Sequence, residues 1–430
     1  MTTIDEQDKI PDAPSRRAVL RGLASGGAAL GALAAAPAAV AQSVKQPPGR
    51  DAEIARQVQP FYGEHQAGIV TPSPAAGLVA SFDVLATSKP DLERLFRTLT
   101  ERIAFLMGGG TPPELDPKFP PADSGVLGPV IVPDNLTVTA AVGASLFDDR
   151  FGLAAVKPRE LVTMTRFPND ALDPEYCHGD LLLQFSSNTP EANIHALRAV
   201  LKATPDLLSL RWKLDGFLPA ATSTAGRKET ARNLLGFKDG TANPNPADAE
   251  AMDRIVWIRP GSEEPAWTAG GTYQVVRIIR NFVERWDRTP LQEQETIIGR
   301  EKASGAALGL KDEFDVPDYS GDPEGKVMPL DAHIRLANPR THQTANSLIL
   351  RRPFNYSRGV TKSGQLDMGL LFICFQSSLN AGFIAVQERL NGEPLEEYIK
   401  PTGGGYFFAL PGVSDKDGYL GQGLLQSVST

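Results

Sequence analysis

The feature that most constrains the fold of this chain is a pair of segments that occurs four times: a short apolar run followed by an amphipathic one. The apolar runs have the length of β-strands, and apolar residues recur at helical spacing in the segments that follow. Strands that alternate with helices predict a β-sheet covered by helices. The four pairs are residues 78–84 with 90–107, 180–185 with 190–202, 273–280 with 290–299, and 369–376 with 379–390.

The second and fourth pairs resemble each other. Each combines an acid and leucines with a Gln, a Ser-Ser pair and a helix, which indicates an internal duplication unless the agreement is a coincidence. Two halves with two strand–helix units each predict an α+β fold of two ferredoxin-like βαββαβ domains, with antiparallel sheets and flanking helices, arranged as a dimeric ferredoxin-like barrel. We predict the N-terminal domain at residues 61–228 and the C-terminal domain at residues 229–430.

One long segment between the first two pairs interrupts this pattern. Residues 108–158 are rich in Pro and Gly and contain a single candidate strand at residues 136–141. The segment is longer than an ordinary connection between two elements. We therefore predict an insertion that packs on the surface.

Residues 1–41 have the composition of a targeting segment. Arg16-Arg17 precedes a Gly- and Ala-rich run at residues 22–36, and residues 39–41 match an A-x-A cleavage signal. The apolar run is too short for a transmembrane helix, and Pro37 interrupts it. The paired arginines predict a twin-arginine signal peptide, followed by a polar linker at residues 42–60. This route carries folded proteins, so we expect a periplasmic protein without stable membrane insertion, whose cofactor is inserted before export.

The charge balance excludes one class of partner. The chain has 51 Asp and Glu and 43 Lys and Arg, which gives a formal net charge of −8. Nucleic-acid binding requires a basic face, so we expect no nucleic-acid partner.

Cysteine usage gives little evidence for a metal site. Cys177 and Cys374 are the two cysteines, and each lies beside an apolar run. We predict two buried free thiols, with a disulfide as the alternative in an oxidising compartment. The absence of a CxxC motif or a Cys/His cluster argues against a zinc or iron–sulfur site.

A single histidine is more often a hydrogen-bonded structural residue than a metal ligand. His195 lies in the expected helix 190–202, and we expect it to be exposed; His65 and His178 have no obvious charged neighbours in sequence. His333 differs, because it opens the sequence His-Ile-Arg-Leu-Ala-Asn-Pro-Arg and precedes Arg351 by eighteen residues. The five histidines are His65, His178, His195, His333 and His342.

Several motifs together resemble the dye-decolourising (DyP-type) haem peroxidase family. Its GxxDG motif is present at residues 236–240, its proximal-ligand segment matches at His333, and its distal arginine matches at Arg351. Residues 61–69 match the mature N-terminus of the family, and residues 403–408 match its C-terminal strand. The resemblance covers residues 60–413. With the signal peptide, the chain is similar to an exported subgroup associated with iron uptake.

The resemblance implies one haem b per chain. His333 would be the axial ligand of the iron. Asp239 would carry a proton between the two oxygens of hydrogen peroxide, and Arg351 would stabilise charge on the leaving oxygen. Arg300 would bind a haem propionate. The other residues implied to line the haem are Gly240, Thr241, Ala242, Asn338, Pro339 and Arg340.

Two further expectations concern the surroundings of the haem. The ring nitrogen of His333 that does not face the iron should donate to an acid or carbonyl; the candidates are Asp367, Glu396 and Glu397. A narrow pocket admits peroxide but not a large dye, so we expect electrons to leave through surface aromatic residues. The candidates for that role are Trp212, Trp257, Trp267, Trp286 and Tyr319.

These residues predict a peroxidase that uses hydrogen peroxide to oxidise dyes, phenols or similar reductants. The first alternative is a deferrochelatase, which would release iron from haem with the porphyrin intact, as part of a periplasmic iron-uptake system. Both activities would use the same pocket. A non-catalytic haem carrier is the second alternative, but haem binding alone requires neither Asp239 nor Arg351. We also expect a homodimer.

Overall fold

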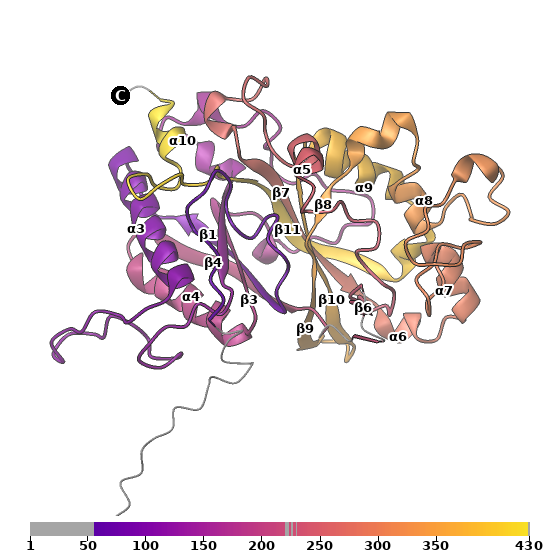
Figure 1. The fold of residues 1–430 in the computed structure, drawn as a ribbon, viewed down its shortest axis with the longest axis horizontal. Helices are drawn as coiled ribbons and strands as arrows, with labels where there is room; N and C mark the ends of the chain where they lie inside the picture. Colours follow the sequence, from indigo (N-terminus) through magenta and orange to yellow (C-terminus); the bar gives the residue numbers. More distant parts are fainter. Residues whose placement is uncertain (1–55, 220–222, 225–226, 229, 429–430) are drawn as a thin grey trace, which may run out of the picture. The chain divides into compact units, whose positions relative to one another are not determined.

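The computed structural model describes residues 56–219, 223–224, 227–228 and 230–428. The predicted signal peptide at residues 1–41 and most of the predicted linker at residues 42–60 lie outside this part of the chain. Figure 1 shows the fold and labels most of its helices and strands.

The N-terminal half has the order βαββαβ, as expected. Its first helix begins after the N-cap Ser88, whose side chain accepts a hydrogen bond from the Asp91 N–H, and its second begins at Pro190, a favoured first helical residue. The elements are β1 (Ala76–Val84), α3 (Lys89–Gly108), β2 (Thr137–Gly143), β3 (Leu181–Ser187), α4 (Pro190–Ala203) and β4 (Leu208–Phe217).

The C-terminal half repeats this order with shorter helices. The principal elements are β7 (Thr272–Asn281), α7 (Leu291–Ile298), β9 (Phe354–Val360), β10 (Leu366–Gln376), the π-helix η7 (Asn380–Ile384) that continues into α9 (Ala385–Leu390), and β11 (Ile399–Ala409). Shorter elements are β5 (Ser223–Thr224), β6 (Arg227–Lys228), α5 (Ala249–Ile255), α6 (Val283–Trp286), α8 (His333–Ala337), β8 (Leu350–Arg351) and α10 (Gln422–Gln426).

The strands of both halves join in one antiparallel sheet that closes into a barrel. The sheet order is β7-β11-β2-β3-β1-β4-β9-β10-β8, and an additional pairing of β7 with β10 closes the ring. Within this order each half keeps the ferredoxin-like arrangement, β2-β3-β1-β4 in the first and β11-β7-β10-β9 in the second. The expected fold class, two ferredoxin-like units that share a barrel, is confirmed.

The barrel interior is one apolar core. Side chains alternate between the two faces of a strand, and all eight strands of the ring contribute alternate residues to a single buried cluster. Among its members are Val79, Leu182, Ile278, Ile373 and Phe407.

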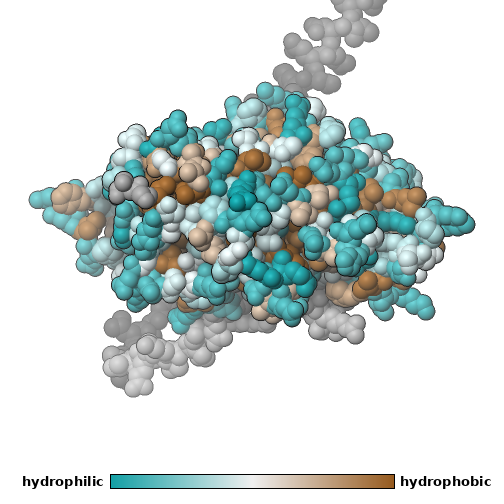
Figure 2. Space-filling view, turned by 90° about the horizontal axis from the view of Figure 1, so that it is seen from above, coloured by the Kyte–Doolittle hydropathy of each residue, from teal (hydrophilic) through white to brown (hydrophobic). Residues whose placement is uncertain are grey.

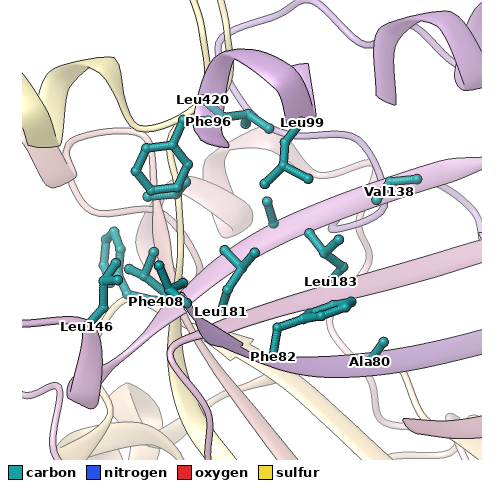
Figure 3. Packing of buried hydrophobic residues seen from close by; sticks show 14 of the residues in the cluster. Ala80, Phe82, Phe96, Leu99, Val138, Leu146, Leu181, Leu183, Phe408 and Leu420 are labelled. Atoms are coloured by element: carbon teal, nitrogen blue, oxygen red, sulfur yellow. The ribbon is translucent and has the colours of Figure 1, made fainter. Parts of the chain in front are cut away.

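A second core lies between the outer face of the N-terminal strands and the helices α3 and α4. Figure 3 shows Phe96 and Leu99 of α3 above strand residues that include Phe82, Leu181 and Leu183. These five side chains are at most 1% exposed. The helices therefore cover the N-terminal side of the barrel.

The structure corrects the prediction for residues 108–158. The expected strand is present as β2, but it is not part of a surface insertion: all seven of its residues are buried, and it pairs with β3 and β11. Its pairing partners lie far away in sequence, so the local composition did not reveal its position. The strands β4 and β9 were not predicted. They combine buried residues with exposed polar ones, which weakens the apolar signal.

Both cysteines are buried free thiols, as predicted. Burial raises the pKa of each thiol. Within the described residues, no helix is both long and apolar enough to cross a membrane. The face drawn in Figure 2 is largely hydrophilic, with small separate groups of hydrophobic residues.

Candidate active site

A cavity of about 270 Å³ lies on the outer face of the C-terminal strands. Its floor includes Arg277 and Ile279 of β7 and Leu370 and Phe372 of β10, the alternate residues to those that fill the barrel interior. The helices α8 and α9 and the π-helix η7 form another wall, with mainly apolar residues. These are Ile334, Ala337, Phe383, Val386 and Leu390.

His333 lies at the first residue of α8 and lines this cavity. Its Nδ1 is 2.7 Å from Oε2 of Glu393, whose side chain is 3% exposed, whereas the imidazole is 32% exposed. A carboxylate only accepts hydrogen bonds, so one proton lies on Nδ1, and in the neutral imidazole Nε2 keeps a free lone pair. Burial lowers the pKa of His333, but the Glu393 carboxylate outweighs this effect, and the pKa is raised overall.

Asp239 and Arg351 form the second polar group of the cavity. Nη1 of Arg351 is 2.5 Å from Oδ1 of Asp239. The side chain of Arg351 is 28% exposed and that of Asp239 is 16% exposed. Nδ2 of Asn233 lies 3.5 Å from the other carboxylate oxygen, and Oδ1 of Asn233 accepts hydrogen bonds from the N–H groups of Leu235 and Phe237. Asn233 thus closes the turn before Asp239 and contacts its carboxylate.

The residue before Asp239 belongs to a different network. Nζ of Lys238 donates to Glu313 Oε2 at 2.6 Å, and Thr241 Oγ1 donates to the other oxygen of Glu313 at 3.0 Å. Burial raises the pKa of Glu313, but hydrogen bonds from Lys238, Thr230 and Thr241 outweigh it and lower the pKa overall. The Lys238–Glu313 ion pair joins the Asp239 loop to the segment before α8. Because Lys238 is bound to Glu313, Arg351 is the cation in contact with Asp239.

A cationic part of the cavity wall lies near Tyr319. Arg300 and Arg340 line the cavity there. Nη1 of Arg300 donates to the carbonyl oxygens of Gly305 and Glu313, and burial lowers the pKa of its guanidinium. Neither arginine has a carboxylate within salt-bridge distance in the described part of the chain. Two cations without carboxylates are suited to a ligand with anionic groups.

The donor set fits a haem. A histidine whose Nδ1 is bound to a carboxylate and whose Nε2 faces a cavity has the form of a metal ligand with its outer partner. The apolar walls suit the porphyrin ring, and Arg300 and Arg340 suit its propionates. The Asp239–Arg351 pair adds an acid and a cation to the lining of the same cavity.

The structure brings together almost all of the residues predicted for this site. Asp239, Gly240, Thr241, Ala242, Arg300, His333, Asn338, Arg340 and Arg351 all line the one cavity. Pro339 is not among the described residues that line it.

Three sequence expectations about the surroundings were wrong. The partner of His333 is Glu393, not Asp367, Glu396 or Glu397. His195 is not exposed: it is 1% exposed, and its Nε2 is 2.7 Å from Oδ2 of Asp123. The tryptophans expected at the surface are buried, since none of the four is more than 8% exposed, and Tyr319 is half-buried and lines the cavity. A role of these aromatic residues in electron transfer stays a prediction.

Comparison with known proteins gives the family. The model of the Dyp-type peroxidase N-terminal domain matches residues 66–218, and that of the Dyp-type peroxidase C-terminal domain matches residues 230–414. The chain belongs to the Dyp-type peroxidase family.

Individual relatives agree with this assignment. The chain is 59% identical over 415 residues to the deferrochelatase of Escherichia coli O6:K15:H31 (strain 536 / UPEC), which covers 96% of this chain and 97% of the relative. The deferrochelatase of Shigella sonnei (strain Ss046) gives the same values. Among solved structures, the DyP-type peroxidase from Cellulomonas bogoriensis and ferric DtpA from Streptomyces lividans each superpose with a TM-score of 0.77 at 34% identity. They cover 87% of this chain and 99% and 98% of their own lengths.

The Glu393–His333 contact leads to a prediction for the haem-free protein. Replacing Glu393 by Gln removes the charge that raises the pKa of His333 and leaves the opposing effect of burial, so the pKa should fall. Nitrogen-15 NMR of the imidazole during a pH titration measures it. Glu397→Gln is the control, because Glu397 is exposed on the same segment. An unchanged His333 titration in Glu393→Gln would contradict the assignment.

Proposed function

We propose that the protein is a haem-dependent peroxidase that binds one haem b and reduces hydrogen peroxide while it oxidises a dye, a phenol or a similar reductant. The observation that carries the proposal is the single cavity that combines a carboxylate-bound histidine with an Asp–Arg pair. Relatives from Streptomyces lividans at 34% identity are described as ferric and oxyferrous, which supports an iron cofactor.

Different residues of the chain bind different parts of the haem. His333 would hold the iron through its ring nitrogen that does not face Glu393, and Glu393 fixes the orientation and proton of the imidazole. Arg300 and Arg340 bind the propionates, and Gly240, Thr241, Ala242 and Asn338 border the ring, as Pro339 does by the family resemblance. When bound, the haem supplies the electrons that reduce peroxide to water and recovers them from the reductant.

Asp239 and Arg351, here called the distal pair, transfer the proton and stabilise the charge. Asp239 takes a proton from one peroxide oxygen and delivers it to the other, which leaves as water. Arg351 stabilises the negative charge that develops on the leaving oxygen. General acid–base help of this kind is typically worth about 10²- to 10⁴-fold in rate. A haem carrier would need neither group, which favours the enzyme over the carrier.

The relatives support a second function. Curated proteins 59% identical to this chain over 96% of its length are named deferrochelatase. We therefore also propose removal of iron from haem with the porphyrin intact, within a periplasmic iron-uptake system. In this reaction the porphyrin takes up two protons as the iron leaves, so the appearance of porphyrin fluorescence after haem is added measures it.

Three further features belong to the proposal. The two domains are residues 61–228 and 229–430, which is supported by the separate family matches. The protein is exported to the periplasm through Arg16-Arg17 and acts as a homodimer. Sedimentation of the purified protein measures the oligomeric state.

The first prediction from this proposal concerns the iron ligand. His333→Ala should lose most bound haem and the Soret spectrum of the wild type, because it removes the nitrogen that would bind the iron. His178→Ala is the control, since His178 does not line the cavity. Absorption spectra and haem content of both variants measure the effect. If His333→Ala kept its haem and His178→Ala did not, the ligand assignment would be wrong.

The second prediction separates the two distal residues. Asp239→Asn and Arg351→Leu should both keep haem, and each should slow the peroxide step by about 10²-fold or more. Asp239→Asn should lose the acid limb of the pH profile, because no carboxylate remains to be protonated. Arg351→Leu should move that limb to higher pH, because a carboxylate without a neighbouring cation holds its proton more tightly. Stopped-flow spectroscopy measures both, and a shift to lower pH in Arg351→Leu would refute the pairing.

The third prediction concerns export. Replacing both Arg16 and Arg17 by Lys should leave folded, haem-loaded protein in the cytoplasm, because the twin-arginine signal is lost. Fractionation of cells followed by haem analysis measures this. Unchanged accumulation in the periplasm would exclude the twin-arginine route.

A further inference from the structure

The distal pair joins two elements that are far apart in sequence. Asp239 lies on a loop, and Arg351 lies at the end of the two-residue strand β8, 112 residues later. The side chains of the pair are 16% and 28% exposed. A partly exposed ion pair contributes little to stability, so the position of β8 relative to the loop needs another explanation.

The backbone of Arg351 faces away from the sheet. Arg351 is in register with Cys374 of β10, and the next residue, Arg352, donates its N–H to the Ile373 carbonyl at 2.7 Å. Successive residues of an antiparallel strand direct their hydrogen-bonding groups to opposite sides. The N–H and C=O of Arg351 therefore point away from β10. In the described sheet, β8 is the last strand, and it pairs with β10 alone.

The side-chain amide of Asn243 occupies this edge. The Arg351 N–H donates to Oδ1 of Asn243 at 2.8 Å, and Nδ2 of Asn243 donates to the Arg351 carbonyl at 3.0 Å. The amide thus satisfies both backbone groups of Arg351, as a neighbouring strand would. Without it, two partly buried polar groups would lack protein partners, which is unfavourable.

Asn243 is also fixed relative to Asp239. Its own N–H donates to the Gly240 carbonyl at 3.0 Å, which closes a turn that starts one residue after Asp239. The Asp239 N–H is held as well, by the Ala231 carbonyl at 2.8 Å. One short, hydrogen-bonded turn therefore carries the distal carboxylate at one end and the amide that binds the backbone of the distal arginine at the other.

We infer that Asn243 is a positioning residue for the proposed peroxide reaction: it sets the distance between Asp239 and Arg351 by joining the Asp239 turn to the free edge of β8. This inference rests on the proposed peroxidase function. It adds a residue to that function, because Asn243 itself does not line the cavity and reaches peroxide only through the pair.

Other charged groups of the cavity do not replace this connection. Lys238 points to Glu313, and His333 is bound to Glu393. The side chain of Arg277 is paired with buried Asp170. The charged residues that border the same cavity as Asp239 are Arg277, Arg300, Arg340, Arg351, Arg389, Lys238, His333, Glu393 and Glu396. Only Arg351 among them forms a salt bridge with Asp239 in the described structure.

The test compares Asn243→Ala and Asn243→Asp with a matched control. The alanine removes both hydrogen bonds, and the aspartate keeps the acceptor but places an oxygen against the Arg351 carbonyl. Asn245→Ala is the control: Asn245 lies two residues on in the same loop, where Oδ1 accepts only the local Ala247 N–H and does not contact β8.

Both Asn243 variants should retain haem and its high-spin spectrum, but the peroxide step should slow by about 10- to 100-fold, as small misplacements of catalytic groups do. The acid limb of the pH profile should persist and move to higher pH, as Arg351 is no longer held at the carboxylate. Crystal structures of the haem-free variants should show the Asp239–Arg351 contact lengthened or lost. Asn245→Ala should match the wild type in all three measurements.

The outcomes separate this inference from the proposed function. If Asn243→Ala and Asn243→Asp kept the wild-type peroxide rate, pH profile and Asp239–Arg351 contact while Arg351→Leu slowed the reaction, the positioning role would be wrong and the peroxidase proposal would stand. Loss of haem in both Asn243 variants would also overturn the role, because Asn243 would then hold the cofactor site as a whole. If Arg351→Leu had no effect either, the proposed function itself would fail.

Discussion

The antiparallel pairing of β7 with β10 is the contact on which the rest of the structure depends. It closes the ring of eight strands, and it fixes which face of each strand is interior. Residues such as Ile278 and Leu371 then fill the barrel, and the residues that alternate with them, Ile279 and Leu370, face outwards. The cavity lies on that outer face, so its floor has the rigidity of a closed sheet. Groups held on rigid elements are positioned more accurately than groups held on loops alone.

The two halves use the same topology differently. In the N-terminal half, the long helices α3 and α4 pack directly on the strands and fill the space above them. Figure 3 shows this packing for α3. In the C-terminal half, the corresponding cover consists of short helices, among them the five-residue α8 and a π-helix. Shorter helices bury less apolar surface against the sheet, and a cavity lies beneath them. Local π-helical turns are frequent at functional sites, and Phe383 of η7 lines this cavity.

Sequence reasoning was most successful where the signal was local. Each of the four strand–helix pairs is present, because an apolar run with helical spacing after it reports directly on local structure. The motif around Asp239 and the context of His333 indicated the cavity residues by resemblance. The reasoning failed where a contact joins distant segments. Glu393 was not among the three acids considered for His333. Which acid contacts His333 depends on how the chain after α9 folds back towards α8, and the spacing of residues in the sequence does not predict that.

The same limit explains why the sequence analysis missed Asn243 and placed β2 in a surface insertion. Asn243 follows the Asp239 motif by three residues, but its importance comes from the free edge of a strand that begins at Leu350. Residues 137–143 looked like part of an insertion, and only their pairing with β3 and β11 places them in the barrel. A local apolar pattern identifies a strand, but the strands that pair with it depend on how the whole sheet closes.

Glu393 and Asp239 border the same cavity, and each has a different role because each contacts a different side chain. Glu393 is buried and faces a histidine, so its charge favours a proton on Nδ1 and strengthens Nε2 as a donor to a metal. Asp239 is also mostly buried, but it faces an arginine, whose charge does not change with pH in the working range. In the proposed reaction that carboxylate is the group that exchanges protons with peroxide. Exchange of the two partners would remove both functions, since an arginine cannot coordinate iron and a histidine beside Asp239 would compete for the proton.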